Sequence, residues 1–307
     1  MAASRLACVW GHIAPVMLAS HHSAAVMSQE SAASVVSRKC STSTDRVITS
    51  AKQRVSGIDF HYEQTGSGKH TVLLLPGALG STRTDFLPQL MGLSVSKYRI
   101  IALDLRGYGK SRPPDRDWPP MFYQRDADDV AAFMKALDIP RYSVLGWSDG
   151  GIIALILAAS HPACVQRLVI WGANAYISNV DLELYKMVQN IDDWSTRMKQ
   201  PFIDLYGEDY FRKQWDSWCN AIQYYVTQRN GDLCIGSLHN IKCPTLIVNG
   251  VKDPMVSQEH PAFLHKHIVT SRLVDFPEGK HNLHLRFHQE FNSLVEQFLD
   301  EDSPTHK

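Results

Sequence analysis

Residues 144–152 read Val-Leu-Gly-Trp-Ser-Asp-Gly-Gly-Ile, and this stretch decides the fold of the chain. Its apolar start predicts a buried strand, which breaks at Ser148 and resumes as an apolar helix over 151–160. A Gly-x-Ser-x-Gly pattern suits a very sharp strand-to-helix turn, because a side chain two residues before or after the serine would collide with its neighbours. The Ser148 hydroxyl would then stand at the amino end of the helix, where the helix dipole favours negative charge. The alternative role for Ser148 is an ordinary helix N-cap.

Continuous aliphatic runs recur on both sides of that stretch. They lie at 71–75, 98–103, 166–171 and 243–250, and helical stretches such as 121–137 alternate with them. Continuous apolar character is typical of a strand that is covered on both faces, as in a parallel sheet. The alternation therefore predicts right-handed βαβ units and an α/β fold with a doubly wound, mostly parallel sheet. In such sheets chemistry takes place at the carboxyl ends of the strands, and Ser148 follows such an end.

Segments before and after these runs are predicted to complete the sheet and its covering helices. A Ser-Gly turn signal at 56–57 precedes alternating apolar residues, which predicts an opening hairpin over 55–63 at a sheet edge. Towards the carboxyl terminus, 257–268 predicts a helix and 272–276 a strand. Apolar residues at spacings of three and four then predict one final helix, and they are Leu283, Phe287, Phe291, Leu294, Val295 and Phe298.

The regular alternation stops between about 175 and 236. This segment is rich in aromatic residues and has no convincing buried strand, which predicts a helical cap inserted into the fold. Aromatic residues at helical spacing are more often core than binding site, although a cap above the strand ends also shapes the pocket beneath it. We therefore divide the body into a core over 46–174, a cap over 175–236 and a second part of the core over 237–307.

Residues 1–45 differ in composition from the body. They are rich in Ala and Ser and, up to residue 44, carry three basic residues against one acid, Glu30. This composition favours a removable mitochondrial transit peptide. A secretory signal is the alternative, because 6–20 is fairly apolar, and an untargeted cytosolic protein is the third interpretation. No apolar run reaches the roughly 18 residues that a membrane-spanning helix needs.

Charge and cysteine spacing exclude several classes of function. The 31 basic and 31 acidic residues balance, so no nucleic-acid or membrane partner is indicated. The cysteines of the body are scattered without any Cys-x-x-Cys spacing, which indicates neither a zinc site nor a disulfide framework. We expect a monomer that acts on a small molecule, without a metal ion or any other cofactor.

Three residues fall on loops at the carboxyl ends of strands, in the chain order Ser148, Asp253, His281. A neutral serine hydroxyl is a poor nucleophile and needs a base to accept its proton. His281 can act as that base, and Asp253 can fix its tautomer and stabilise the imidazolium. Each has an alternative role alone, since Asp253 could simply start a turn and His281 is one of 14 histidines. Together at the ends of the right elements, they predict a catalytic triad.

With these residues in place, the chain resembles the α/β-hydrolase superfamily over about 55–300. The matching motifs are Leu-Leu-Pro-Gly-Ala-Leu-Gly at 74–80, Asp-Leu-Arg-Gly-Tyr-Gly-Lys-Ser at 104–111, Gly-Trp-Ser-Asp-Gly-Gly at 146–151, Asn-Gly-x-x-Asp-Pro at 249–254 and Gly-Lys-His-Asn at 279–282. Val-Ile-Trp-Gly-Ala-Asn-Ala-Tyr at 169–176 and Pro-Glu-Gly-Lys-His-Asn-Leu-His-Leu-Arg-Phe at 277–287 are most similar to its biphenyl hydrolase-like branch. The resemblance implies a serine esterase that releases alcohols from α-amino acid esters, including prodrugs of nucleoside analogues.

The resemblance also bears on the choice of catalytic residues. Some members of the superfamily carry the acid after the sixth strand, where this chain has Asn174, so Asp253 is the better assignment. Other branches use an aspartate nucleophile, and Ser148 excludes their alkyl-enzyme chemistry.

An oxyanion hole would be built from backbone N–H groups. Many relatives have His-Gly where this chain has Pro-Gly at 76–77, a change that need not cost activity because side chains do not donate. We assign the donors to Asp149 and to either Leu79 or Ala78.

Asp149 directly follows the predicted nucleophile. An acid in the first helical turn commonly interacts with the helix dipole and nothing more. A carboxylate here could instead lie a few ångströms from the acyl Cα, where it would bind the α-ammonium group of an amino acid ester. The resemblance implies the same role.

Two other functions stay open. A carbon–carbon bond hydrolase of dienoate ketones is one, although such an enzyme would need cationic groups for its acidic substrate. A catalytically silent α/β-hydrolase fold that serves as a binding protein is the other.

Overall fold

The computed structural model describes residues 46–302, so the predicted transit peptide lies outside the described residues. Their sheet has the order β1-β2-β4-β3-β5-β6-β7-β8. The strands are β1 Thr49–Val55, β2 Ile58–Thr65, β3 His70–Leu75, β4 Tyr98–Leu103, β5 Tyr142–Trp147, β6 Val165–Trp171, β7 Thr245–Gly250 and β8 Ser271–Phe276. The hairpin β1–β2 pairs antiparallel with β4, and every later pairing is parallel. The predicted edge hairpin and mostly parallel sheet are confirmed.

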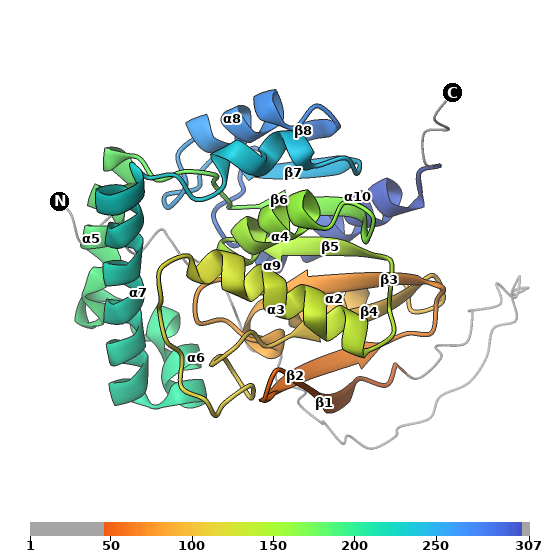
Figure 1. The fold of residues 1–307 in the computed structure, drawn as a ribbon, viewed down its shortest axis with the longest axis horizontal. Helices are drawn as coiled ribbons and strands as arrows, with labels where there is room; N and C mark the ends of the chain where they lie inside the picture. The colour runs from red at the N-terminus through yellow and green to blue at the C-terminus, as the bar shows by residue number, and fades with distance from the viewer. Residues whose placement is uncertain (1–45, 303–307) are drawn as a thin grey trace, which may run out of the picture.

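Helices cover both faces of this sheet (Figure 1). One face is covered by α3 Phe122–Ala136, α4 Asp149–Ser160 and α8 Glu259–His267, and the other by α2 Thr82–Gly92, α9 Leu283–Arg286 and α10 His288–Asp300. Alternate residues of β3 enter the two cores, with Leu73 and Leu75 on the α3–α4 side and Val72 and Leu74 on the α2–α10 side. Burial on both faces explains why the strands are continuous aliphatic runs.

Three helices stand between β6 and β7 in the chain, over the ends of the strands (Figure 1). They are α5 Asn179–Gln189, α6 Thr196–Tyr206 and α7 Glu208–Arg229, with short 3-10 helices at Ile191–Asp193 and Ile235–Asn240. Many of their aromatic side chains pack on one another: Phe202 stacks on Phe211 with ring centroids 4.9 Å apart, and Trp194 meets Trp215 edge-on at 4.9 Å. We call α5–α7 the cap.

The prediction of one final helix is wrong. The chain forms a single turn, α9, and then starts α10 after Phe287, whose φ and ψ of −108° and 37° depart from helical values. The reason lies in His284, which is fully buried and accepts a hydrogen bond from Trp171 Nε1 while its own Nε2 donates to the Asp85 carbonyl. Burial lowers the pKa of His284 to about 3, so the ring is neutral. These hydrogen bonds hold the turn α9 apart from α10. The apolar residues keep their helical spacing across the break, so the sequence pattern does not reveal it.

Two further expectations from the sequence concern the cysteines and membrane-spanning helices. Within residues 46–302 the four cysteines are free thiols, of which Cys234 and Cys243 are buried. Among the described helices, none combines the length and apolar character that crossing a bilayer requires.

Candidate active site

The turn between β5 and α4 has the geometry that its glycines predict. Ser148 has φ 54° and ψ −122°, a conformation that costs energy for a residue with a side chain. A Cβ on Gly146 would lie 2.4 Å from the Gly150 carbonyl oxygen, and a Cβ on Gly150 would lie 2.1 Å from the Leu75 carbonyl oxygen. Ser148 occupies the N-cap position of α4, but its side chain makes no capping hydrogen bond to the helix, so helix capping does not explain the serine at this position.

The structure brings Ser148, His281 and Asp253 together. His281 Nε2 lies 3.1 Å from Ser148 Oγ, and His281 Nδ1 lies 2.9 Å from Asp253 Oδ2. Because a carboxylate only accepts, Nδ1 carries the proton and Nε2 is left to accept one from Ser148. The second oxygen of Asp253 accepts the N–H groups of Met255 and Val256, so the turn role considered for Asp253 exists alongside the contact with His281.

The imidazole of His281 is held in place from two sides. Trp147 Nε1 donates to the His281 carbonyl over 2.8 Å, and the two rings lie 5.4 Å apart. Gly172 follows β6, has φ +57° and lies against the His281 ring. A Cβ on this residue would come within 2.9 Å of His281 Nδ1 and Cε1. Asn174, at the alternative acid position, instead donates to the Tyr176 carbonyl. Asp253 is therefore the acid that reaches His281.

Gly172→Ala is expected to lower kcat roughly 100-fold, because the added methyl group must displace the His281 ring and small misplacements of a catalytic group have effects of that size. Gly57→Ala is the matched control, since Gly57 also has a positive φ, +84°, and a Cβ there meets nothing within 4 Å. Steady-state hydrolysis of a simple ester checks both variants. A Gly172→Ala enzyme as active as Gly57→Ala would contradict this contact.

Asp149 is buried beside the nucleophile, and neutral groups bind both of its oxygens. The Tyr123 hydroxyl of α3 donates to Oδ1 over 2.9 Å, and Trp218 Nε1 of the cap donates to Oδ2 over 2.8 Å. Burial raises the pKa of Asp149 to about 6, although these hydrogen bonds and the more distant Arg116 oppose the rise. Arg116 itself is paired with the buried Asp126 at 2.6 Å. Among residues 46–302, Asp149 is thus a carboxylate without a cation in direct contact.

The sequence did not allow Tyr123 and Trp218 to be predicted as site residues. The first belongs to the apolar stripe of α3 and the second to the aromatic residues of the cap, so each has the pattern of a core residue. Their hydrogen bonds to one carboxylate depend on the packing of the cap on the core. Sequence spacing carries no signal of that contact.

The pocket above Ser148 is narrow and mostly apolar. Its walls include Ile152, Ile177, Tyr185, Phe202, Trp215, Ile222, Leu233, Met255 and Val256 from the core and the cap. Space for the centre of a water molecule amounts to about 40 Å³, which is enough for only a few waters. The charged or titratable groups among its lining residues are Asp85, Asp149, His281 and two tyrosines, with no Lys or Arg.

Two backbone N–H groups are placed to form an oxyanion hole. Ala78 and Asp149 both line the pocket, and neither N–H has a hydrogen-bond acceptor within residues 46–302. Leu79 does not line the pocket, and its carbonyl accepts the Tyr206 hydroxyl. Of the two candidates from the sequence, Ala78 is therefore the one that lines the pocket with Ser148.

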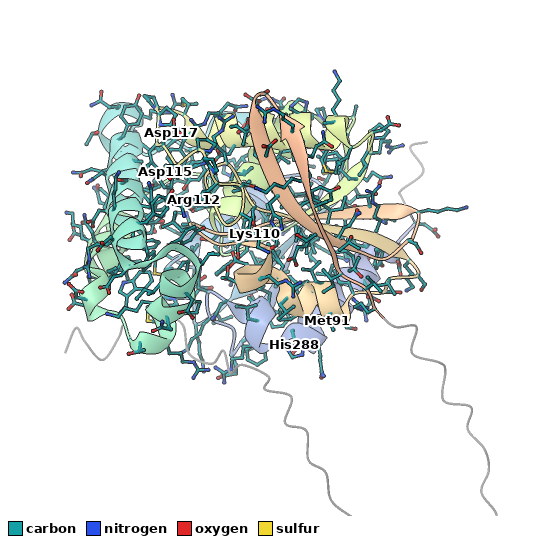
Figure 2. The ribbon with its side chains drawn as sticks, turned by 90° about the horizontal axis from the view of Figure 1, so that it is seen from below. Met91, Lys110, Arg112, Asp115, Asp117 and His288 are labelled. Carbon is teal, nitrogen blue, oxygen red and sulfur yellow. The ribbon has the colours of Figure 1, made fainter. Side chains whose placement is uncertain are left out.

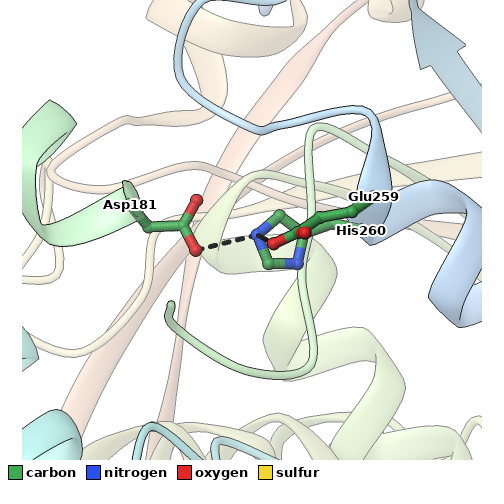
Figure 3. A group of neighbouring side chains, drawn as sticks. All are labelled: Asp181, Glu259 and His260. Atoms are coloured by element: carbon green, nitrogen blue, oxygen red, sulfur yellow. Dashed lines mark hydrogen bonds and ion pairs between the residues drawn. The ribbon is translucent and has the colours of Figure 1, made fainter. Parts of the chain in front are cut away.

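Away from the pocket, Asp181, Glu259 and His260 gather where α5 meets α8 (Figure 3). One ligand atom from each could lie within 4.8 Å of the others, which is a spacing that a divalent cation could use. His260 Nε2 lies 2.8 Å from Asp181 Oδ2, and that oxygen also accepts the N–H and hydroxyl of Ser178. Burial would raise the pKa of Asp181, but these hydrogen bonds outweigh it and lower the pKa. We interpret the group as a buried pair that ties the cap to the core.

Comparisons with known proteins agree with this geometry. The model of the alpha/beta hydrolase family matches residues 72–294. The chain is 51% identical over 252 residues to serine hydrolase BPHL of Homo sapiens, covering 82% of this chain and 87% of that protein. The protein of the same name in Mus musculus is 50% identical over the same shares of the two chains. A solved meta-cleavage product hydrolase, 21% identical with a TM-score of 0.67 over 82% of this chain and 98% of that one, supports the fold alone. This chain therefore belongs to the α/β-hydrolase family and is a serine hydrolase.

Proposed function

We propose that the protein hydrolyses esters of α-amino acids through an acyl-enzyme on Ser148. The observation that carries the proposal is Asp149, a buried carboxylate directly after the nucleophile whose hydrogen-bond partners are both neutral. A substrate ammonium group would supply the charge partner that this carboxylate lacks in the described part of the chain. The apolar walls around it would accept the side chain of an amino acid such as valine.

The reaction follows from the hydrogen bonds of the triad. Ser148 Oγ attacks the ester carbonyl while His281 Nε2 takes its proton, and Asp253 stabilises the imidazolium. The N–H groups of Ala78 and Asp149 bind the oxyanion. His281 then protonates the departing alcohol, and water repeats the sequence on the acyl-enzyme with the same base.

Trapping the acyl-enzyme tests this proposal. After rapid acid quench of a reaction with a valine ester, we expect a valyl group on the peptide that contains Ser148. A fluorophosphonate probe should label the wild type and leave Ser148→Ala unlabelled. Absence of labelling from the folded wild type would favour the catalytically silent binding protein.

Carbon–carbon bond hydrolysis of dienoate ketones is the rival enzyme activity. An acidic substrate of that kind calls for a cation, and the lining residues of this pocket include Asp85 and Asp149 but no Lys or Arg. Turnover of a dienoate ketone with no turnover of either amino or simple esters would replace our proposal with that activity.

The preference for a free amine should depend on pH. As the pH falls through about 6, the Asp149 carboxyl gains a proton and loses its attraction for the ammonium group. Above roughly pH 8 the α-amino group of the substrate loses its own charge. The ratio of kcat/KM for a valine ester to kcat/KM for its N-acetyl counterpart should therefore rise through pH 6 and fall again in alkali. A ratio that stays constant from pH 5 to pH 9 would contradict this role of Asp149, since effects on the triad cancel in the ratio.

A further inference from the structure

The loop of residues 76–80 carries the Ala78 donor in a strained conformation. Leu79, its neighbour, has φ 55°, in the left-handed region, which is strained for a residue other than glycine. One backbone bond, from Gly80 N–H to the Gly77 carbonyl over 3.0 Å, closes the turn. Further contacts must hold such a backbone, because strain of this kind persists only where the surroundings impose it.

The core holds the loop from below through Asp85 of α2. Its Oδ2 accepts the Gly77 N–H over 3.0 Å, and its Oδ1 accepts the Thr84 hydroxyl over 2.7 Å. A Cβ on Gly80 would come within 1.9 Å of Oδ2, so the carboxyl group fits directly under the turn. The residue before Ala78 is thus fixed to a core helix.

The cap holds the loop from the other side through Tyr206, the last residue of α6. Its hydroxyl donates to the Leu79 carbonyl over 2.9 Å and accepts the Gly109 N–H over 2.8 Å. Gly109 lies on the loop between β4 and α3, and Arg112 of the same loop, labelled in Figure 2, packs its guanidinium over the rings of Tyr206 and Tyr210 in the cap. Burial raises the pKa of Tyr206 well above its ordinary value, which keeps the hydroxyl a donor.

We propose that Tyr206 is a positioning residue through which the cap sets the Ala78 oxyanion donor, with Asp85 as its counterpart in the core. The two side chains bind the residues immediately before and after Ala78, so together they fix the direction of its N–H. The cap then takes part in transition-state stabilisation as well as in forming the pocket wall. An ester whose alcohol keeps α6 away from the loop would lose part of its kcat. This inference rests on the proposed acyl transfer at Ser148, and it is independent of the preference for amino esters.

The matched pair Tyr206→Phe and Tyr210→Phe tests it. Each loses one hydroxyl that contacts a core loop, but the Tyr210 hydroxyl accepts the Arg116 N–H and does not touch residues 76–80. We expect Tyr206→Phe to lower kcat on a simple N-acetyl ester roughly 10-fold to 100-fold with KM nearly unchanged, less than the loss of a whole oxyanion donor. A boronic acid, which forms a tetrahedral adduct on the serine, should bind more weakly by the same factor. Tyr210→Phe should change neither value.

Equal kcat values and equal boronate affinities for the two variants would overturn the inference, as would a Tyr206→Phe effect on KM alone. Asp85→Asn keeps the shape of the side chain but has one acceptor oxygen where Asp85 uses two, so it should also lower kcat and boronate affinity. Wild type without activity on any ester would count against the proposed function instead, which separates the two failures. Thermal unfolding of each variant identifies a loss of activity that comes from unfolding.

Discussion

Ser148→Ala is expected to lower kcat for every ester by roughly 10⁵-fold or more. Removal of the nucleophile leaves only binding and the oxyanion donors, and serine hydrolases lose activity on this scale when a triad member that handles the proton or the bond is removed. The effect should be as large for an N-acetyl ester as for an amino ester, because both react at the same Oγ. Single-turnover assays at high enzyme concentration measure so low a residual rate.

The same experiment includes tests of the partners of Ser148. His281→Ala should be about as inactive as Ser148→Ala, and the double variant should be no worse, because the two act as a unit. Asp253→Asn keeps its shape but no longer stabilises the correct tautomer, so a loss of roughly 10⁴-fold is expected. Substantial activity in Ser148→Ala would mean that another residue is the nucleophile.

Asp149→Asn is expected to lower kcat/KM for a valine ester roughly 100-fold, and to leave the N-acetyl ester within a few-fold of wild type. The magnitude follows from the loss of one charge-assisted contact in a buried site, worth about 3 kcal/mol. The amide has nearly the volume of the carboxyl group, so the oxyanion N–H of residue 149 should stay in place. Equal losses on both esters would make Asp149 a structural residue.

The same substitution should stabilise the protein at neutral pH. Burial raises the pKa of Asp149 from 3.8 to about 6. The buried charge therefore destabilises the folded state at pH values above 3.8, the pKa in the unfolded chain, and the full destabilisation is reached once the pH exceeds about 6. Removing the charge should therefore increase the free energy of unfolding at pH 8, by at most about 3 kcal/mol, and leave it nearly unchanged at pH 3. Urea unfolding at the two pH values measures this. A less stable Asp149→Asn protein at pH 8 would mean that the hydrogen bonds from Tyr123 and Trp218 outweigh the burial of charge.

The sequence was sufficient for the parts of the fold that depend on local pattern. The apolar runs at 71–75, 98–103 and 166–171 nearly coincide with β3, β4 and β6, because strands buried on both faces leave a continuous signal. The triad residues could be proposed because parallel strands bring their carboxyl ends to one edge, whatever separates them in the chain. The Gly-x-Ser-x-Gly turn was predicted for a steric reason, and the close approaches at Gly146 and Gly150 supply that reason.

Other features required the packing of the cap on the core. Tyr123, Trp218 and Tyr206 each bind a polar partner that is distant in sequence, so their aromatic pattern predicts burial and nothing more. The choice of Ala78 over Leu79 depended on which of them lines the pocket, and the loop that decides this has a left-handed φ at Leu79, which propensity does not encode for leucine. The break at Phe287 lies within an unbroken apolar period, and the buried hydrogen bonds of His284 account for it.

The most direct test of the proposed function compares a valine ester with its N-acetyl counterpart, both with the same alcohol, on wild type and on Asp149→Asn. We expect wild type to prefer the free-amine ester by roughly 100-fold in kcat/KM, and the variant to lose that preference while it still hydrolyses the N-acetyl ester. Equal kcat/KM values for the two esters on wild type, or a preference that survives in Asp149→Asn, would contradict an α-amino acid esterase anchored by Asp149.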